Sequence, residues 1–315
     1  MIYFIVNPAA SGGRGLRVWR RVQECVQRLH PEGYQYYLTE KQGDARRFSH
    51  AITTGSDADR TVAVIGGQGT LNEVIDGSCL DRADVAFAYI PTSWEKYNFL
   101  QSVFQTATLQ ERLQRILTDK DVRLLDYGVL SNPSLNRRFV MSAGVGFNAA
   151  VFLDFYGNEC AARCAGRKGK YRVLVKSRRL MFLQSFIREF LKAKRTRGYV
   201  VIEDETADKH EFNNIMFASA LVRPYGSGLS DCKKDADERI EFCVVSTRHK
   251  LRLLRVIWAI VSGRSTKLDG VHIYRGKAMD IVLDQPLPAH VDGEYVGMQD
   301  RFTLRSVPRR LRVSI

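Results

Sequence analysis

The sequence predicts an α/β N-terminal domain, built on a parallel sheet with helices on both faces, followed by a mostly antiparallel β-sandwich C-terminal domain. In the first third of the chain, short apolar segments alternate with amphipathic segments, which is typical of βαβ units. From about residue 121, short apolar segments are separated by turn residues instead, which indicates antiparallel strands. A length of 315 residues favours two domains over one.

The N-terminal part is expected to contain four strands and four helices. Its first segment is apolar throughout and leads directly into Asn7-Pro8, which favours a buried strand over a secretory signal. β-branched residues favour a strand over 61–65. The expected strands are residues 1–6, 34–38, 61–65 and 85–90. The expected helices cover residues 16–29, 44–53 and 110–117, and a further helix opens at 71–76.

The C-terminal part carries apolar segments bounded by turns such as Asn132-Pro133 and Asp292-Gly293. Helices are expected in the basic stretch between residues 163 and 197 and at 251–261. We place the first domain at residues 1–122 and the second at 123–306, and the last segment, 307–315, can return to the first. The expected strands are residues 123–130, 138–143, 199–203, 213–220, 240–246, 277–283 and 302–306.

The cysteines argue against a zinc site. Six are present, and none belongs to a CxxC pair. This pattern favours a reduced, cytoplasmic protein. No apolar run is long enough to cross a bilayer, so membrane association is expected to be peripheral.

The net charge of +14 predicts attraction to an anionic partner: nucleic acid, a membrane surface or a phosphorylated substrate. Much of the excess lies between Arg163 and Arg197, where Glu189 is the only acid. Apolar residues recur there at helical spacing, so the segment suits an anionic membrane surface, or else packs on the core with a solvated basic face. No zinc finger or aromatic stacking motif accompanies the charge, so no nucleic-acid partner is expected.

Two glycine-rich turns follow strands in the first part of the chain. Asn7 to Gly15 follows the first strand, and Gly66-Gly67-Gln68-Gly69-Thr70 follows the strand at 61–65. Glycines let a backbone approach a phosphate closely, and the N-terminus of the next helix attracts it. Neither turn is a P-loop or a Rossmann fingerprint. One such turn alone is compatible with a plain strand-to-helix connection, so the pairing is the informative feature.

This pairing resembles the catalytic domain of diacylglycerol kinases and sphingosine kinases, including their bacterial soluble relatives. Other segments match that family in the same order, and the resemblance spans nearly the whole chain. The acidic turn near the C-terminus favours the lipid branch over kinases that act on NAD or fructose phosphate. The matching segments are Thr39 to Ala45, Asn72 to Gly77, Leu125 to Gly128, Ala143 to Phe147, Tyr225 to Gly228, Asp237 and Val291 to Glu294.

The resemblance implies that ATP binds in a cleft between a nucleotide-binding first domain and a lipid-substrate second domain, with Mg²⁺ as the metal. Glu294 or Asp292 would accept the proton of the lipid hydroxyl, and the family pattern favours Glu294. From the residues alone, Asp292-Gly293 is also compatible with a simple hairpin corner. The implied metal ligands are Asp237 and Asp126. The implied nucleotide-binding residues are Asn7, Ser11, Gly12, Thr39, Gly66, Gly67, Gln68, Gly69, Thr70, Asn72 and Glu73.

Three departures from the family pattern leave a second function open. Gln68 stands where the family carries aspartate, and Lys234 replaces a usual oxygen ligand near Asp237. The segment from Ser93 to Tyr97 replaces the family's Gly-Thr-x-Asn-Asp. The sequence therefore predicts an ATP-dependent lipid kinase acting on diacylglycerol or a related lipid, and the alternative is a catalytically degenerate relative that binds lipid or nucleotide. A homodimer is left open.

Overall fold

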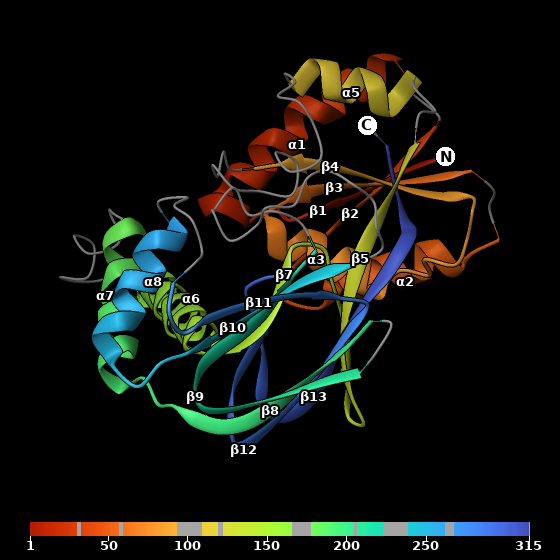
Figure 1. The fold of residues 1–315 in the computed structure, drawn as a ribbon. Helices are drawn as coiled ribbons and strands as arrows, with labels where there is room; N and C mark the ends of the chain where they lie inside the picture. The colour runs from red at the N-terminus through yellow and green to blue at the C-terminus, as the bar shows by residue number, and fades with distance from the viewer. Residues whose placement is uncertain are drawn as a thin grey trace. The chain divides into compact units, whose positions relative to one another are not determined.

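The computed structural model of the chain divides into two compact units (Figure 1). The first unit comprises Met1–Tyr127, Arg138–Val140 and Val307–Ile315, and the second comprises Gly128–Arg137 and Met141–Ser306. The structure describes residues 1–29, 33–56, 59–92, 109–118, 122–165, 178–204, 207–222, 239–261 and 268–314.

The first unit is built on a parallel sheet. Its strand order is β13-β4-β3-β1-β2, and every one of these neighbours pairs in parallel. The register aligns Val6 with both Leu38 and Ile65, and Gly66 with Pro91, so the carboxyl ends of the strands meet at one edge. The four expected strands are therefore present. They are β1 (Ile2–Val6), β2 (Tyr34–Leu38), β3 (Arg60–Gly66) and β4 (Val85–Pro91), and β13 is Glu294–Ser314.

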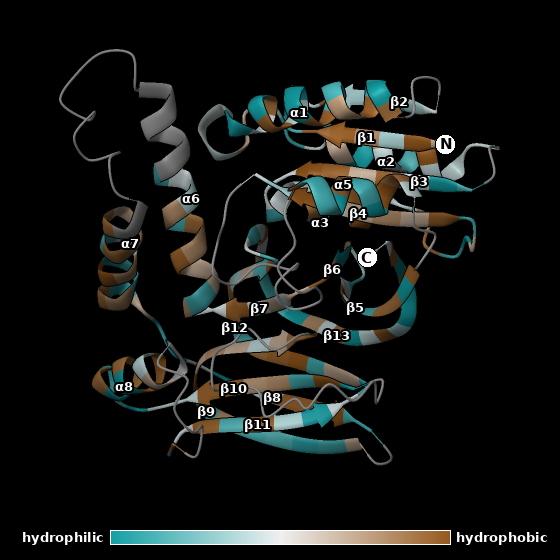
Figure 2. Ribbon diagram, turned by 90° about the horizontal axis from the view of Figure 1, so that it is seen from above, coloured by the Kyte–Doolittle hydropathy of each residue, from teal (hydrophilic) through white to brown (hydrophobic). Residues whose placement is uncertain are grey.

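Helices cover both faces of this sheet, because successive side chains of each strand point to opposite faces. Phe4 and Val6 of β1 join one core cluster with Trp19 of α1 (Ala10–Leu29) and Leu113 of α5 (Leu109–Thr118). The intervening Ile5 is fully buried on the opposite face, where α2 (Asp44–Thr54) and α3 (Gln68–Gly77) contact β1 and β3. The strands β1, β3 and β4 are mostly apolar, as expected for a sheet buried on both faces (Figure 2).

The second unit is mostly antiparallel, as predicted. Its main strand order is β11-β10-β9-β7-β12-β13, and β8 pairs with both β9 and β12. All of these pairings are antiparallel. The remaining strands are β5 (Val122–Asn132), β6 (Leu135–Phe139), β7 (Ser142–Gly146), β8 (Thr196–Glu203), β9 (Ala207–Leu221), β10 (Ile240–Ser246), β11 (Val271–Gly276) and β12 (Ala278–Val291).

Three helices of the second unit pack around one apolar cluster. They are α6 (Phe147–Ala165), α7 (Arg178–Lys192) and α8 (Lys250–Val261), and the cluster includes Phe147, Phe186 and Leu253. The helix α6 was not predicted, because its apolar residues are spread around the helix and Gly157 interrupts the pattern. In the part of the chain that the structure describes, no helix is both long and apolar enough to span a bilayer.

Two predicted boundaries are corrected. The strand expected at 138–143 is two strands, because β6 ends at Phe139 and β7 begins at Ser142. Regular helical backbone in α1 begins at Arg14 rather than at residue 16, because Ser11 to Gly13 have left-handed backbone angles.

Candidate functional site

The first glycine-rich turn reverses the chain after β1. Ser11, Gly12 and Gly13 have φ values of 51°, 69° and 89°, the left-handed region that glycine occupies at no steric cost. Ser11 is not a glycine, and its backbone there costs about 1 kcal/mol. Its hydroxyl forms a 3.0 Å hydrogen bond with that of Thr92, which follows β4, and this bond helps hold the turn in place.

Gly15 makes the closest backbone approach in this turn. A Cβ at this position would lie 1.8 Å from the carbonyl oxygen of Asn7. The backbone N–H of Asn7 donates to the carbonyl of Ile65 at 2.8 Å, and this bond connects the turn to β3. The position therefore accepts only glycine without a shift of the loop.

The second turn meets the first through side chains. Asn7 Nδ2 donates a 3.0 Å hydrogen bond to Thr70 Oγ1. A Cβ on Gly66 would lie 2.7 Å from Thr70, so the second turn closes tightly on itself. The N-cap of α3 is Gly67, which has no side chain to bond the first N–H groups of the helix. The two turns thus lie together at the carboxyl edge of the sheet, beside a helix N-terminus that favours anions.

The segment after β2 is attached to the same edge. Thr39 donates its N–H to the carbonyl of Val6 at 2.9 Å. Glu73 of α3 accepts a 3.0 Å hydrogen bond from the N–H of Gly43. The N–H groups of Lys41 and Glu40 bind the carboxylate of Asp44 and lower its pKa. The predicted residues Thr39 and Glu73 are therefore positioned with the two glycine turns.

Asn72 lies elsewhere on α3. Its side chain is fully buried, and Nδ2 donates to the carbonyl of Arg138 at 2.9 Å. The guanidinium of Arg138 donates to the carbonyls of Ile75 and Asp76 at 3.2 and 3.3 Å and so binds the C-terminal end of α3. Sequence reasoning missed Arg138, since a lone arginine in a strand carries no local signal for a partner sixty residues away.

The acidic turn of the second unit joins β12 to β13. Asp292 and Gly293 have φ values of 48° and 86°, as a tight hairpin corner requires. Asp292 Oδ1 accepts hydrogen bonds from the N–H groups of Met141 and Ser142 at 2.8 and 2.9 Å. Glu294 Oε2 accepts a 2.9 Å hydrogen bond from Arg137 Nη2, in an ion pair whose side chains are largely buried. The aspartate therefore anchors the turn, and the arginine orients the glutamate.

A buried histidine supports this turn from within the second unit. His290 is 2 % exposed, and burial lowers its pKa to about 4. Its Nδ1 accepts from the N–H of Gly293 at 3.3 Å, and its Nε2 lies 3.1 Å from the side-chain amide of Asn148 in α6. Sequence reasoning found neither residue, because α6 was not expected and the strand that contains His290 was expected to end at residue 283.

The low pKa of His290 predicts acid sensitivity. Below pH 6.5 the unfolded chain binds a proton that the folded protein excludes until about pH 4. Stability should therefore fall by about 3 kcal/mol as the pH drops through this window. Urea unfolding of the wild type and of His290→Gln from pH 7 to pH 4 measures the effect. A steeper fall in the wild type is expected, and equal slopes would contradict the assignment.

Of the two predicted metal ligands, the structure describes only Asp126. Asp126 Oδ1 accepts a 2.8 Å hydrogen bond from the N–H of Arg309. Asp237, Lys234, the Ser93 to Tyr97 segment and the Tyr225 to Gly228 segment lie outside the described residues. Within the described ranges, no three His, Cys, Asp or Glu side chains gather as a metal site would require. The first turn of α3 also contains no acid.

Comparison with known proteins agrees with this architecture. The diacylglycerol kinase catalytic domain matches residues 1–126, and the YegS C-terminal NAD kinase beta sandwich-like domain matches residues 160–315. The chain is a divergent member of the diacylglycerol kinase-like lipid kinase family. The resemblance inferred from the glycine turns and the acidic turn is thereby confirmed.

Known proteins match this chain along nearly its whole length. "Putative lipid kinase YtlR" from Bacillus subtilis (strain 168) is 27% identical over 318 residues, covering 99% of this chain and 98% of that protein. A solved structure described as "A putative diacylglycerol kinase from Bacillus anthracis str. Sterne" has a TM-score of 0.70 at 16% identity, covering 99% of this chain and 96% of the other. Another diacylglycerol kinase structure from the same organism has a TM-score of 0.65 at 13% identity, with the same coverage. At these identities the solved structures show a shared fold.

Proposed function

We propose that this kinase-family protein transfers the γ-phosphoryl group of ATP to a hydroxyl of diacylglycerol or a related lipid. The observation that carries the proposal is the 3.0 Å hydrogen bond between Asn7 and Thr70. It joins two glycine-rich turns beside the uncapped N-terminus of α3, which is an arrangement suited to the phosphates of a nucleotide. The names of the relatives support lipid as the acceptor.

The proposal gives each unit a separate task. Backbone groups of Ser11, Gly12 and Gly67 to Thr70 in the first unit hold the phosphates. Glu294 of the second unit accepts the proton of the lipid hydroxyl. We prefer Glu294 to Asp292 because one oxygen of Asp292 already accepts two backbone N–H groups. Mg²⁺, which the family implies at Asp237 and Asp126, would offset charge on the phosphoryl group when bound.

An assay of phosphoryl transfer tests this function. Purified protein is incubated with γ-labelled ATP, Mg²⁺ or Mn²⁺, and vesicles that contain diacylglycerol, and the label is followed into the lipid fraction. Transfer to diacylglycerol is expected, and a broad lipid extract replaces it to find a related acceptor. The proposal fails if no lipid is labelled with either metal.

Exposed apolar side chains of the second unit support a membrane as the source of the lipid. Leu180, Leu183, Ile187 and Leu191 follow one another along α7 with exposures of 47%, 50%, 50% and 69%. Leu251, Leu254 and Trp258 form a similar exposed row on α8, which packs with α7 around one cluster. An exposed apolar surface flanked by cations suits insertion at an anionic membrane surface. We propose that these two rows contact the bilayer.

Removing part of the apolar row should weaken membrane binding. The double variant Leu183→Ser/Ile187→Ser loses two large aliphatic groups, and we expect at least a tenfold lower partition onto phosphatidylglycerol vesicles in co-sedimentation. Gln184→Ser, an exposed change on the same helix, is the matched control and should bind as the wild type does. Equal partition of the double variant and the control would exclude α7 from the contact.

A second function is favoured by the absence of any acid in the first turn of α3. With Gln68 in place of the family's aspartate, the protein would bind nucleotide or lipid without transfer. Thermal stabilisation by ATP that does not depend on Mg²⁺, together with no lipid labelling, would support this function. Lipid labelling by the native protein would exclude it, and Gln68→Asp should then leave the reaction unchanged or faster.

A further inference from the structure

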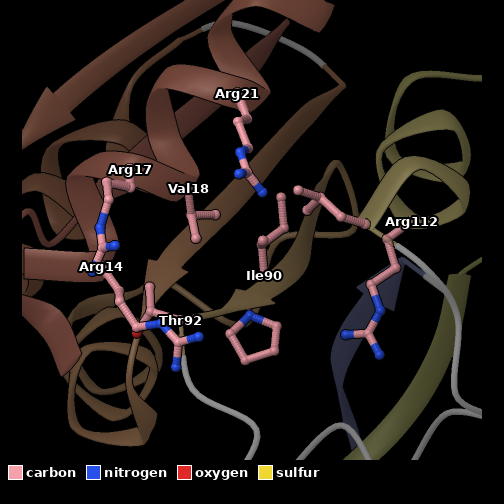
Figure 3. Close-up of a pocket in the computed structure, with 9 residues that line it drawn as sticks. Arg14, Arg17, Val18, Arg21, Ile90, Thr92 and Arg112 are labelled. Atoms are coloured by element: carbon pink, nitrogen blue, oxygen red, sulfur yellow. The ribbon is translucent and has the colours of Figure 1, made fainter.

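A cavity of about 290 Å³ lies in the first unit between α1, the end of β4 and α5. Figure 3 shows arginines projecting from α1 on one side and Arg112 from α5 on the other, with Ile90 and Thr92 of the β4 end between them. Among the residues that the structure describes, none that lines the cavity is acidic. Its volume is close to the lower end of the range for small-molecule sites, roughly 300 Å³. The lining residues are Arg14, Arg17, Val18, Arg21, Ile90, Pro91, Thr92, Leu109 and Arg112.

The helix geometry gathers the positive charge. Arg14, Arg17 and Arg21 are spaced three and four residues apart, which places them on one face of α1. The helix α5 covers the same face of the sheet and brings Arg112 to the cavity. Within the described part of the chain, none of these four guanidinium groups forms an ion pair with a carboxylate. Among the described residues, no carboxylate at ion-pair distance offsets their mutual repulsion.

Arg112 carries the strongest indication of a missing partner. Its Nη1 atom is buried and has no hydrogen-bond partner in the structure. Burial also lowers the pKa of its guanidinium, with a further contribution from Arg115. A buried donor without an acceptor typically costs about 1–3 kcal/mol, and more when it is charged. A ligand with acceptor oxygens in the cavity would satisfy this donor.

We propose that this arginine cavity binds a phosphate group, as inorganic phosphate, a soluble phosphate ester or the phosphate of a lipid headgroup. Guanidinium groups match phosphate oxygens in geometry and charge, and four of them offset the two charges of a phosphate monoester. The lining includes Arg14 and Thr92 beside the first glycine-rich turn, but not Ser11, Gly12 or Gly66 to Thr70, so the cavity adjoins the corner proposed for the nucleotide without sharing the residues assigned to its phosphates. It therefore goes beyond the proposed kinase reaction and does not depend on it.

The proposal is tested by thermal stabilisation and calorimetric titration of the purified protein. One arm uses inorganic phosphate and glycerol 3-phosphate, compared with chloride at equal ionic strength. A second arm uses vesicles with phosphatidic acid, compared with phosphatidylcholine alone. Stabilisation in the first arm identifies a soluble ligand, and stabilisation confined to the second identifies a lipid headgroup. If neither arm stabilises the wild type, the proposal is wrong.

Matched arginine variants locate the effect. Arg21→Gln and Arg112→Gln should weaken phosphate binding at least tenfold, since each removes charge-assisted hydrogen bonds. Arg20→Gln on α1 and Arg115→Gln on α5 remove the same charge from residues that do not line the cavity, and they should bind as the wild type does. An equal loss in all four variants would indicate diffuse surface charge and would overturn the proposal.

Two further measurements distinguish phosphate binding in the cavity from a packing role of Arg112 and from binding at the nucleotide corner. Without phosphate, Arg112→Gln should be at least as stable as the wild type, because it removes a buried unpaired cation, whereas a packing role predicts a loss. Stabilisation by Mg²⁺ATP should be unchanged in Arg21→Gln. If this variant loses the ATP response as well, the cavity belongs to the nucleotide site and the separate phosphate site is excluded.

Discussion

Glu294→Gln is expected to lower the rate of lipid phosphorylation by about 10²–10⁴-fold, the usual contribution of a general base. Glutamine has the shape of glutamate and keeps an oxygen that can accept the hydrogen bond from Arg137, which is 2.9 Å long in the wild type. It cannot take the proton of the lipid hydroxyl. The initial rate of label transfer at saturating ATP and lipid measures the effect.

The controls distinguish the base from its neighbours. Glu211→Gln removes an exposed carboxylate on β9 that pairs with Lys209, and it should leave the rate unchanged. Asp292→Asn weakens the acceptor for two backbone N–H groups, so it should act mainly on stability. A normal rate in Glu294→Gln, together with no activity in a folded Asp292→Asn, would show that Asp292 is the base.

Gly15→Ala is expected to destabilise the first unit by about 3 kcal/mol or more, at the upper end of the cost of overpacking. The added Cβ would lie 1.8 Å from the carbonyl oxygen of Asn7, so the backbone of the turn must move. Such a movement also displaces Asn7 from Thr70 and should remove stabilisation by ATP. Chemical denaturation with and without ATP measures both effects.

Two other glycines provide the comparison. A Cβ on Gly12 meets no atom within 4 Å, but its φ of +69° makes Gly12→Ala cost about 1–2 kcal/mol. A Cβ on Gly157 in α6 also meets no atom within 4 Å, and its φ is not in the left-handed region. Gly157→Ala should therefore be neutral or stabilise by up to about 1 kcal/mol. If Gly15→Ala costs no more than Gly12→Ala, the close approach to Asn7 is not a constraint.

The features that the sequence predicted are those encoded locally. The β-branched residues of β3 and the alternation of strands with helices indicate a parallel sheet without knowledge of distant partners. Glycines after β1 likewise mark backbone that only glycine adopts easily, and Gly66 at the end of β3 marks a close approach to Thr70. The catalytic role predicted for Glu294 came from the family resemblance. The residues around Glu294 alone are equally compatible with a plain hairpin.

The features that the sequence did not predict depend on contacts between distant segments. Arg138 binds the end of α3, and Asn148 reaches His290 from a helix with no clear apolar face. The arginine row of α1 is readable at helical spacing once the helix is known. This row lies near Arg112 only because α1 and α5 cover the same face of the sheet. The periodicity of a single helix does not predict which face of the sheet it covers.

The long strand β13 has a consequence for synthesis of the protein. Its last residues, Val307–Ile315, belong to the first unit, where Val313 pairs with Phe87 of β4. During translation, β4 therefore remains an open sheet edge until almost the whole of the second unit has left the ribosome. An unpaired edge of this kind is a template for aggregation. The N-terminal sheet, although made first, is completed last.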